Sequence, residues 1–391
     1  MKQESKTKTV ILSVVGLVFA ALCVLLLPWL ATRVGADSGS KAGAAAKSTA
    51  DAVTAYEMDV NNLVAKSMLE LEELPVNVYI PVPAKSYMLS EDTVIAPKPN
   101  PANFGTSTNA EDVIPAMEAA AALMGDEPFL FDPAVERLPG SKVRWYQDET
   151  IFSVTWKELI NGRAAYSFSE IKIAHPSQFR RYFADNRFAN PIQYTTSQMY
   201  AVVNAVTAMS GDFYKFRPTG TVVYNRTLYR LDPWNSLDIC YVDTDGDLLF
   251  VKAGVLRSEE AVNQYVAEHD VLFSLAFGPV LIEDGVSVAP STYLVGEIHD
   301  RYSRAAICQL GPCHYLLVTV NSEGGYTGLA TIPSLTRALL DKGIQHAYTL
   351  DGGQTATIVT EGRVFNHVNY GAERQISDII YFATAIPEDE R

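Results

Sequence analysis

Hydrophobic positions divide the 391-residue chain into stretches of different texture. Residues 10–31 form an uncharged apolar run, long enough for the ~20 residues with which a helix spans a bilayer. Residues 52–74 place apolar side chains at helical spacing, and Pro75 ends that predicted helix. Recurring prolines up to Pro101 then predict an extended tether, which a short Ala-rich helix over residues 113–124 follows.

From residue 141 onward the hydrophobic runs become short, β-branched and aromatic, and turn residues bound them, as is typical of strands. The predicted helices are fewer, and the last one has Thr331 as its cap and Gly343 at its end. The sequence therefore predicts an α+β fold, a mixed, strand-dominated sheet domain with a few packed helices. The predicted elements are strands at 151–156, 165–173, 221–224, 248–251 and 315–320, and helices at 196–209, 258–268 and 334–342.

The N-terminal apolar run also predicts where the chain is placed. Lysines at positions 2, 6 and 8 precede the run, and basic residues hold that flank in the cytoplasm, so the following chain is predicted to be extracytoplasmic. We expect a cytoplasmic tip and transmembrane signal anchor over 1–33, a stalk, juxtamembrane helix and Pro-rich tether over 34–140, and one domain over 141–391. The alternative is a secreted chain cleaved near Ala36, although the apolar part of a signal peptide usually has only ~7–15 residues.

Composition and charge limit the classes of partner. A hydrophobic content of 48% excludes disorder over most of the chain, and a formal net charge of −14 repels nucleic acid, so no nucleic-acid partner is predicted. The six His residues show no ligand spacing, and we predict neither a metal nor another cofactor. Asp243-Thr-Asp245-Gly-Asp247 looks like the opening of a calcium loop, but its glycine is misplaced, and a hairpin turn explains it better.

Three stretches differ from ordinary strand and turn sequence. One places Arg304 at the start of a predicted strand, and another runs a strand into Asp351 and two glycines. Adjacent glycines adopt backbone conformations that turn successive N–H groups toward one point, and such a nest binds phosphate. Taken alone, Asp-Gly-Gly also fits an ordinary tight turn. The stretches are Ser210-Gly211-Asp212-Phe213-Tyr214, Ser303-Arg304-Ala-Ala-Ile307, and Tyr348-Thr-Leu350-Asp351-Gly352-Gly353-Gln354-Thr355.

In this order the three stretches resemble the phosphodiester glycosidase family over residues 144–382. The family's Asn-Gly-Asp-Phe-Tyr appears with Ser210 in place of its Asn, and its Leu-Asp-Gly-Gly-Gly-Ser appears with Gln354-Thr355 in place of its Gly-Ser. The family's Arg-Thr-Ala-Ile-Gly begins here at Arg304 and ends at Cys308. Its Phe-Gly-Pro strand and its Glu-Arg pair resemble residues 274–282 and residues 373–374.

The resemblance implies hydrolysis of the bond between the anomeric carbon of a sugar and a phosphodiester. It implies that Asp212 and Asp351 are the catalytic carboxylates, with the choice of nucleophile or base left open, and that Arg304 clamps the phosphate. Arg374 is either a second clamp or an ion-pair partner of Glu373. The predicted substrate-binding residues are Ser210, Gly211, Gly352, Gly353, Gln354, Thr355 and Arg374, with the Gly352 and Gly353 amides as a second anion contact.

The predicted partners are therefore a glycan or sugar-phosphate substrate of the cell envelope or the extracellular space, and the membrane through the N-terminal helix. The alternative is a non-catalytic carbohydrate-phosphate binding or envelope-assembly protein on the same fold, which the departures at Ser210, Cys308 and Gln354 motivate. We expect Gln354 to line the pocket and alter which sugar is accepted, because its amide can donate and accept hydrogen bonds. The alternative is a side chain that points into solvent.

Two cysteines flank a predicted turn. Residues 309–312 read as a four-residue turn, which would place Cys308 and Cys313 opposite each other on neighbouring strands. Facing positions lie within disulfide range, and an exported domain is oxidised, so a disulfide is predicted. The alternative is two reduced thiols.

Overall fold

The computed structural model describes residues 87–390, except 235, 295 and 296. The predicted membrane span, the stalk and the helix predicted over 52–74 lie outside the described residues. Over the described ranges, no helix has the length and apolar character needed to cross a membrane. These residues fall within one compact unit, Lys85–Arg391.

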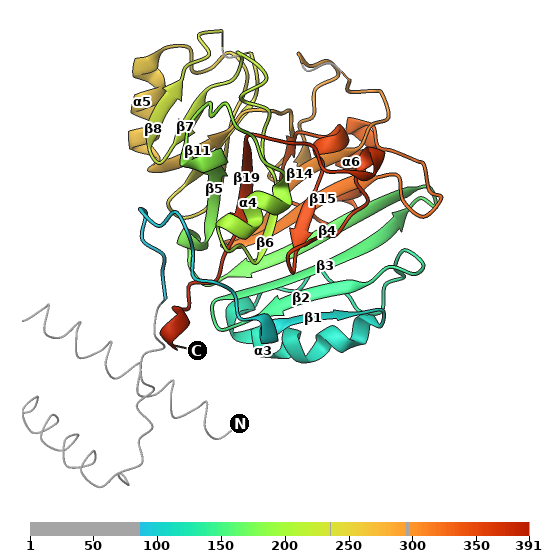
Figure 1. Ribbon diagram of the computed structural model, residues 1–391. Helices are drawn as coiled ribbons and strands as arrows, with labels where there is room; N and C mark the ends of the chain where they lie inside the picture. The colour runs from blue at the N-terminus through green and yellow to red at the C-terminus, as the bar shows by residue number, and fades with distance from the viewer. Residues whose placement is uncertain (1–86, 235, 295–296, 391) are drawn as a thin grey trace, which may run out of the picture. The chain divides into compact units, whose positions relative to one another are not determined.

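The largest sheet has nine strands in the order β1-β2-β3-β4-β15-β14-β16-β12-β13 (Figure 1). Its long middle strands are buried on both faces. Along β15, Tyr315 and Leu317 belong to one hydrophobic core, while Leu316 and Val318 belong to another, as the alternation of strand side chains requires. The strands are β1 (Phe104–Ser107), β2 (Val143–Gln147), β3 (Ile151–Ile160), β4 (Ala164–Ile173), β15 (His314–Asn321), β14 (Arg304–Gly311), β16 (His346–Leu350), β12 (Val280–Glu283) and β13 (Val286–Ser287).

Two five-stranded sheets contribute strands to the first of these cores. One runs β10-β9-β11-β7-β8 and the other β18-β17-β6-β19-β5. Every described strand pair is antiparallel, so the prediction of a mixed sheet is wrong. The strands are β10 (Leu248–Val251), β9 (Ile239–Asp243), β11 (Val271–Leu275), β7 (Val222–Tyr224), β8 (Thr227–Arg230), β18 (Arg363–Val364), β17 (Ile358–Thr360), β6 (Thr207–Ser210), β19 (Asp378–Phe382) and β5 (Phe179–Phe183).

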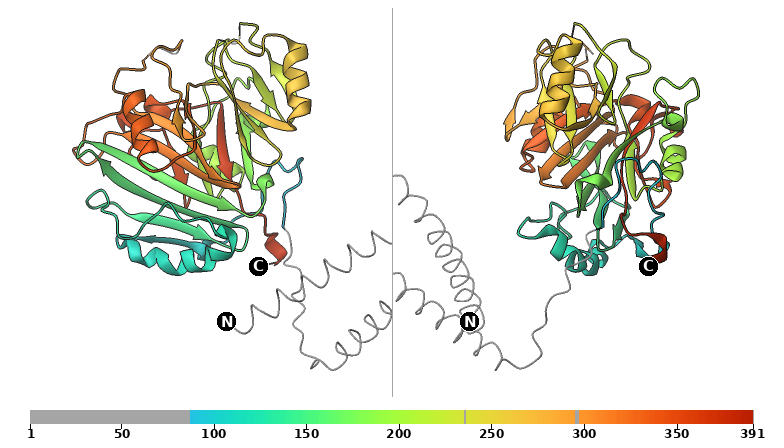
Figure 2. Two further views of the ribbon diagram at one scale, coloured as in Figure 1. Left: turned by 180° about the vertical axis from the view of Figure 1, so that it is seen from behind. Right: turned by 90° about the vertical axis from the view of Figure 1, so that its left-hand side faces the viewer.

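Among the described residues, four α-helices cover the sheets (Figure 2). Helices α3 (Ile114–Met124) and α6 (Ile332–Leu340) pack into the second core of the large sheet, and α5 (Glu259–Glu268) packs on the sheet that contains β9. Ser258 caps α5 and Thr331 caps α6, because each side chain accepts a hydrogen bond from the third residue of its helix. The cap predicted at Thr331 is therefore confirmed.

The helix predicted over 196–209 is too long. Helix α4 (Thr196–Val202) ends early, and Asn204 takes a left-handed backbone with φ 55°. The next residues form β6, a central strand that pairs with both β17 and β19. Pairing on both edges therefore outweighs the helical spacing of the apolar residues in this stretch.

Four of the five predicted strands lie within observed strands, namely β3, β4, β10 and β15, and the strand predicted over 221–224 begins one residue before β7. A strand-dominated domain with few helices is thus confirmed. The acidic stretch over residues 243–247 is the turn between β9 and β10, as predicted, and Val242 pairs with Leu248 across it. The single-turn 3-10 helices are Pro101–Asn103, Ala110–Val113, Pro176–Gln178, Ala184–Asn186, Gly353–Thr355, Asn369–Gly371 and Glu388–Glu390.

The described part of the predicted tether packs on the domain. Arg180 donates to the carbonyl oxygens of Glu91 at 2.8 Å and Thr93 at 2.6 Å, and β1 pairs with β2 along the edge of the large sheet. The boundary expected at residue 141 therefore falls inside one compact unit. The described part of this proline-rich segment is thus an extended chain, and side-chain donors such as Arg180 hold it against the domain.

The predicted disulfide is not formed. In the hairpin of β14 and β15, Cys308 pairs with Leu316, and both Cys308 and Cys313 are free thiols. The ladder continues to Gly311 and His314, so the turn contains only Pro312 and Cys313. The predicted turn of residues 309–312 therefore starts too early, and Cys313 lies in the turn with φ 54°.

Candidate active site

A pocket of about 440 Å³ lies where β16 ends and β14 begins. These strands are antiparallel neighbours, and Ala305 pairs with Leu350, so the residues just beyond that pair share one end of the sheet. The volume is in the range of small-molecule sites. Of the predicted site residues, the pocket is lined by Arg304, Asp351, Gly352, Gly353, Gln354 and Arg374.

Asp351 is the carboxyl group in this pocket whose pKa is shifted. Burial raises the pKa of Asp351 to about 6, while a hydrogen bond from Thr355 and the positive charges of Arg374 and Arg217 offset only part of that rise. A carboxyl group with this pKa changes its protonation just below neutral pH. Perturbed carboxyl groups in a pocket are typical of catalytic sites.

The two glycines after Asp351 allow β16 and β14 to approach closely. A Cβ at Gly352 would lie 2.4 Å from the carbonyl oxygen of Ser303, and the Gly353 N–H donates to that same oxygen at 2.8 Å. The Gly353 amide is therefore already occupied. The predicted nest of two free amides is not formed, although both residues line the pocket.

Gln354 and Thr355 face different surroundings. Gln354 lines the pocket, and its amide nitrogen donates to the carbonyl oxygen of Ala372 at 3.1 Å. Thr355 is buried beneath the pocket, where its hydroxyl bonds the carbonyl oxygen of Gly352 and also the carboxylate of Asp351. Thr355 therefore positions Asp351, and Gln354 joins two segments of the pocket wall.

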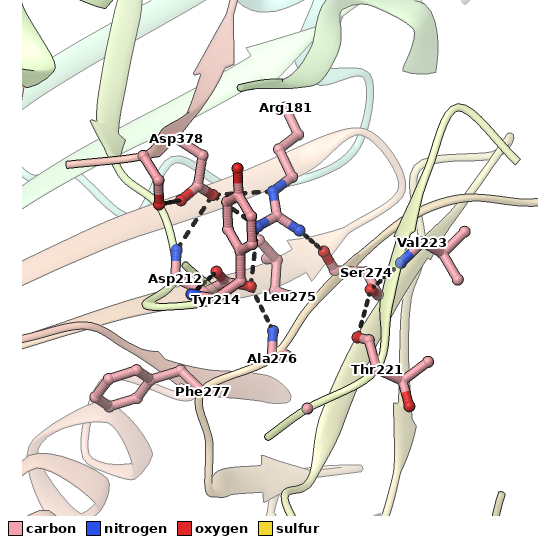
Figure 3. Close-up of polar contacts among 12 residues, drawn as sticks. Arg181, Asp212, Tyr214, Thr221, Val223, Ser274, Leu275, Ala276, Phe277 and Asp378 are labelled. Carbon is pink, nitrogen blue, oxygen red and sulfur yellow. Dashed lines mark hydrogen bonds and ion pairs between the residues drawn. The ribbon is translucent and has the colours of Figure 1, made fainter. Parts of the chain in front are cut away.

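Asp212 lies in a buried cluster outside the pocket lining (Figure 3). Its carboxylate accepts from the backbone N–H of Tyr214 at 2.8 Å and of Ala276 at 2.7 Å, and it pairs with Arg181 at 3.0 Å. Arg181 also pairs with Asp378 at 2.8 Å, and the side chains of Arg181, Asp212 and Asp378 are fully buried. The predicted role of Asp212 as a carboxylate that meets the substrate does not fit this arrangement.

Within this cluster, Arg181 forms ion pairs with both Asp212 and Asp378. Burial raises the pKa of Asp378 against the positive charge of Arg181, and the negative charge of Asp212 adds to the rise. The surroundings of Asp378 therefore favour its protonated form. The cluster joins β5, β19 and the loop after β6.

Ser210 and Gly211 also lie outside the pocket lining. Ser210 is buried at the end of β6, where its N–H donates to Thr357. A Cβ at Gly211 would lie 2.1 Å from a carboxylate oxygen of Asp378, so only glycine leaves room for the buried cluster. Ser210 and Gly211, both predicted as substrate-binding residues, therefore pack around Asp378 and β6 and not along the pocket.

Arg304 lines the pocket, but it is also committed to the backbone. Its Nε donates to the carbonyl oxygen of Ala330 at 3.0 Å, and its Nη2 donates to those of Glu297 at 2.6 Å and Asp300 at 2.8 Å. These bonds hold the segment that forms one wall of the pocket. The predicted phosphate clamp thus has a structural task that uses two of its three nitrogens.

Arg374 lines the pocket without Glu373 as a partner. The Glu373 carboxylate instead binds the N–H and the hydroxyl of Ser197 at the start of α4. Arg374 lies over the rings of Phe213 at 5.4 Å and Phe216 at 5.2 Å, and it forms no ion pair with any described residue. The geometry therefore agrees with a cation available to an anion, the first of the two predicted alternatives.

Arg217 was missed in the sequence, although it lines the same pocket. Its guanidinium lies over the rings of Phe277 at 4.6 Å and Phe213 at 5.2 Å. The available signal is the alternation of aromatic and basic residues in Phe213-Tyr-Lys-Phe216-Arg217, directly after a family motif. In the part of the chain that the structure describes, no group of three or more His, Cys, Asp or Glu residues is placed to hold a metal.

Cavities of about 630 Å³ and about 340 Å³ elsewhere in the described residues contain no residue of the three motifs. A further cavity, of about 280 Å³, lies against residues 88–94. It contains none of the three motifs, and its Arg180 is bound to backbone carbonyl groups. The pocket at Asp351 is therefore the candidate active site.

All residues that line this pocket lie within the stretch of the chain that matches a known family. Residues 201–383 match the family model described as phosphodiester glycosidase, which confirms the resemblance seen in the sequence. This is a family of glycosidases, and the matched region includes both Asp351 and Arg217. Over just under half of its length, the chain is therefore similar to the phosphodiester glycosidase family.

Individual relatives are distant. The SPbeta prophage-derived uncharacterized protein YomE of Bacillus subtilis (strain 168) is 25% identical over 117 residues, 30% of this chain and 18% of that protein. The chain thus spans less than a fifth of that relative's length. The zebrafish N-acetylglucosamine-1-phosphodiester alpha-N-acetylglucosaminidase catalytic domain, auto-inhibited by pro-peptide, is 14% identical, with a TM-score of 0.48 over 61% of this chain and 84% of that one. A hypothetical protein from Synechocystis is also 14% identical, with a TM-score of 0.44 over 60% of this chain and 62% of that one.

Proposed function

We propose that the protein hydrolyses the bond between the anomeric carbon of a sugar and the oxygen of a phosphodiester. The observation that carries the proposal is the pocket at the end of β16, where Asp351, with its pKa raised to about 6, lies with Arg217, Arg304 and Arg374. A carboxylate meets the positive charge that develops on the sugar, and cations meet the phosphate.

The reaction needs little help for the leaving group. The C–O bond to the anomeric carbon breaks, its electron pair stays on the phosphate oxygen, and water supplies a hydroxyl group to the carbon. The remaining proton of that water passes to solvent, directly or through a base. The products are the free sugar and a phosphomonoester. In its ionised form Asp351 stabilises the developing oxocarbenium character directly or as the base or nucleophile. Three arginines line the pocket, and their positive charges repel one another unless an anionic group lies between them. The negative charge of a phosphodiester meets this requirement.

We further propose that the substrate is a glycan or sugar-phosphate of the cell envelope or the extracellular space. The predicted N-terminal anchor and its basic flank support this location. Proteolytic accessibility of the C-terminal domain in intact cells tests the orientation, because an extracytoplasmic domain is cut without lysis.

Isotope labelling tests the reaction type. The full chain is incubated in ¹⁸O-labelled water with a panel that includes the methyl phosphodiesters of glucose 1-phosphate and N-acetylglucosamine 1-phosphate. Glycosidic cleavage places the label in the released sugar. Label in a phosphate product instead would show attack at phosphorus and overturn the proposal.

The second candidate is a protein that binds a sugar-phosphodiester without cleaving it. Glycosidases commonly use two carboxylates, whereas Asp212 lies outside the lining of this pocket. Ligand that is retained without any product after prolonged incubation would favour this candidate.

A further inference from the structure

We infer that Arg217, rather than Arg304, is the residue that grips the phosphate group. The inference rests on the proposed function and deepens it by assigning the anion contact. The Nε, Nη1 and Nη2 atoms of Arg217 are all buried and have no hydrogen-bond partner among the described residues. These atoms belong to a side chain that lines the pocket with Asp351 and Arg374.

Two other buried arginines, Arg304 and Arg181, have protein acceptors for their guanidinium groups. Arg304 donates to three backbone carbonyl groups, and Arg181 binds two carboxylates and the carbonyl oxygen of Ser274. A buried charged group without acceptors is strongly unfavourable, so native proteins pair such groups. Arg217 departs from this pattern inside the pocket, which points to an anionic ligand as its acceptor.

Aromatic rings hold the Arg217 cation without using its N–H groups. Phe277 and Phe213 contact its charge through their faces at 4.6 Å and 5.2 Å. The five N–H donors at the edge of the guanidinium plane remain available for parallel hydrogen bonds to two phosphate oxygens. Arg374 lies over the same Phe213 ring at 5.4 Å, so two cations flank one ring.

The buried cluster around Asp212 fixes these rings. The Asp212 carboxylate accepts from Tyr214, the residue after Phe213, and from Ala276, the residue before Phe277 (Figure 3). One carboxylate therefore ties together the two loops that carry the rings beneath Arg217. Asp212 is a positioning residue for the phosphate contact, whereas Arg217 makes it.

Binding of inorganic phosphate tests the inference without any turnover. Calorimetric titration of the full chain is done for the parent, for Arg217→Gln, and for Arg257→Gln as a matched control on the exposed surface. Loss of a charge-assisted bidentate contact should weaken phosphate binding by about tenfold or more in Arg217→Gln. The control should bind like the parent.

Equal affinity of the parent and Arg217→Gln, or no measurable phosphate binding by the parent, would overturn the inference. If Arg217→Gln does not fold, Arg217→Lys keeps a charge but loses the planar fork, and it should bind phosphate several-fold more weakly. Affinity equal to the parent in the folded Lys variant would also overturn it. The ¹⁸O experiment on the parent separately decides the proposed function, because it asks which bond breaks and does not depend on Arg217.

Discussion

Two aspartates with similar sequence surroundings lie in opposite environments. Asp212 follows β6 and a glycine, and Asp351 follows β16 and precedes two glycines. Asp212 is saturated by two backbone N–H donors and Arg181. Asp351 faces the pocket, and burial raises its pKa to about 6. A carboxylate in a family motif can thus act on the substrate or hold the surrounding loops in place. The number of hydrogen-bond donors around the carboxylate distinguishes these two roles.

The largest expected effect on stability comes from Asp212→Asn. The amide replaces one acceptor oxygen by a donor, although Tyr214, Ala276 and Arg181 all present donors to this side chain. The free energy of unfolding should fall by about 2–4 kcal/mol, because buried donors lose their acceptor. Urea denaturation measures it.

Asp245→Asn is the matched control, since Asp245 lies exposed in the turn between β9 and β10. Its free energy of unfolding should stay within about 0.5 kcal/mol of the parent. Equal stability of Asp212→Asn and Asp245→Asn would remove the contrast between the two aspartates.

Asp351→Asn should affect stability in the opposite direction, and its effect should depend on pH. The pKa of Asp351 is raised from 3.8 to about 6 in the folded chain. The folded chain therefore holds a proton that the unfolded chain releases between these values, and this group's contribution to stability falls as pH rises through that window. As pH rises from below the lower of these pKa values to above the higher one, the free energy of unfolding of Asp351→Asn should increase by about 2–3 kcal/mol relative to that of the parent.

Denaturation curves of Asp351→Asn and the parent at several pH values measure this difference. A difference that stays constant with pH would show that the Asp351 carboxyl has an ordinary pKa.

Arg304→Gln should show a smaller loss of stability. The variant loses charged hydrogen bonds to the carbonyl groups of Ala330, Glu297 and Asp300, which hold one wall of the pocket. We expect a loss of about 1–3 kcal/mol in the free energy of unfolding, with phosphate affinity reduced much less than in Arg217→Gln. A loss of phosphate affinity as large as that in Arg217→Gln would return the clamp role to Arg304.

The smallest effect is expected for Gln354→Gly. Gln354 lines the pocket and is tied to Ala372, so its removal should change the relative kcat/KM for different sugars by less than about tenfold while cleavage persists. Turnover of the phosphodiester panel by the variant and the parent measures this change. An unchanged order and ratio of substrates would mean that Gln354 only supports the wall.

The fold could be predicted where strands are long and contain many β-branched or aromatic residues. β3 and β4 are such strands, and Asp351 with its glycines was found because the family motif is local in sequence. The role of Asp212 could not be predicted in the same way. Its partner Arg181 lies in Phe179-Arg-Arg-Tyr-Phe183, and burial of that charge depends on Asp378, which is 197 residues away in the sequence.

Arg217 and the cysteines show two further limits of sequence reasoning. A single arginine after a motif has no spacing that distinguishes a ligand contact from a surface charge, and only the surrounding rings reveal its task. The pairing of Cys308 with Leu316 depends on where the β14–β15 turn begins. A shift in the start of a turn changes every opposing pair in the hairpin.

The pH dependence of kcat/KM for the best phosphodiester of the panel tests the central claim most directly, namely that Asp351 is the reacting carboxylate. If its ionised form is required, kcat/KM should be constant near neutral pH and fall about tenfold per pH unit below the pKa of about 6. A profile that stays flat between about pH 5 and about pH 7 in the folded protein would contradict this assignment.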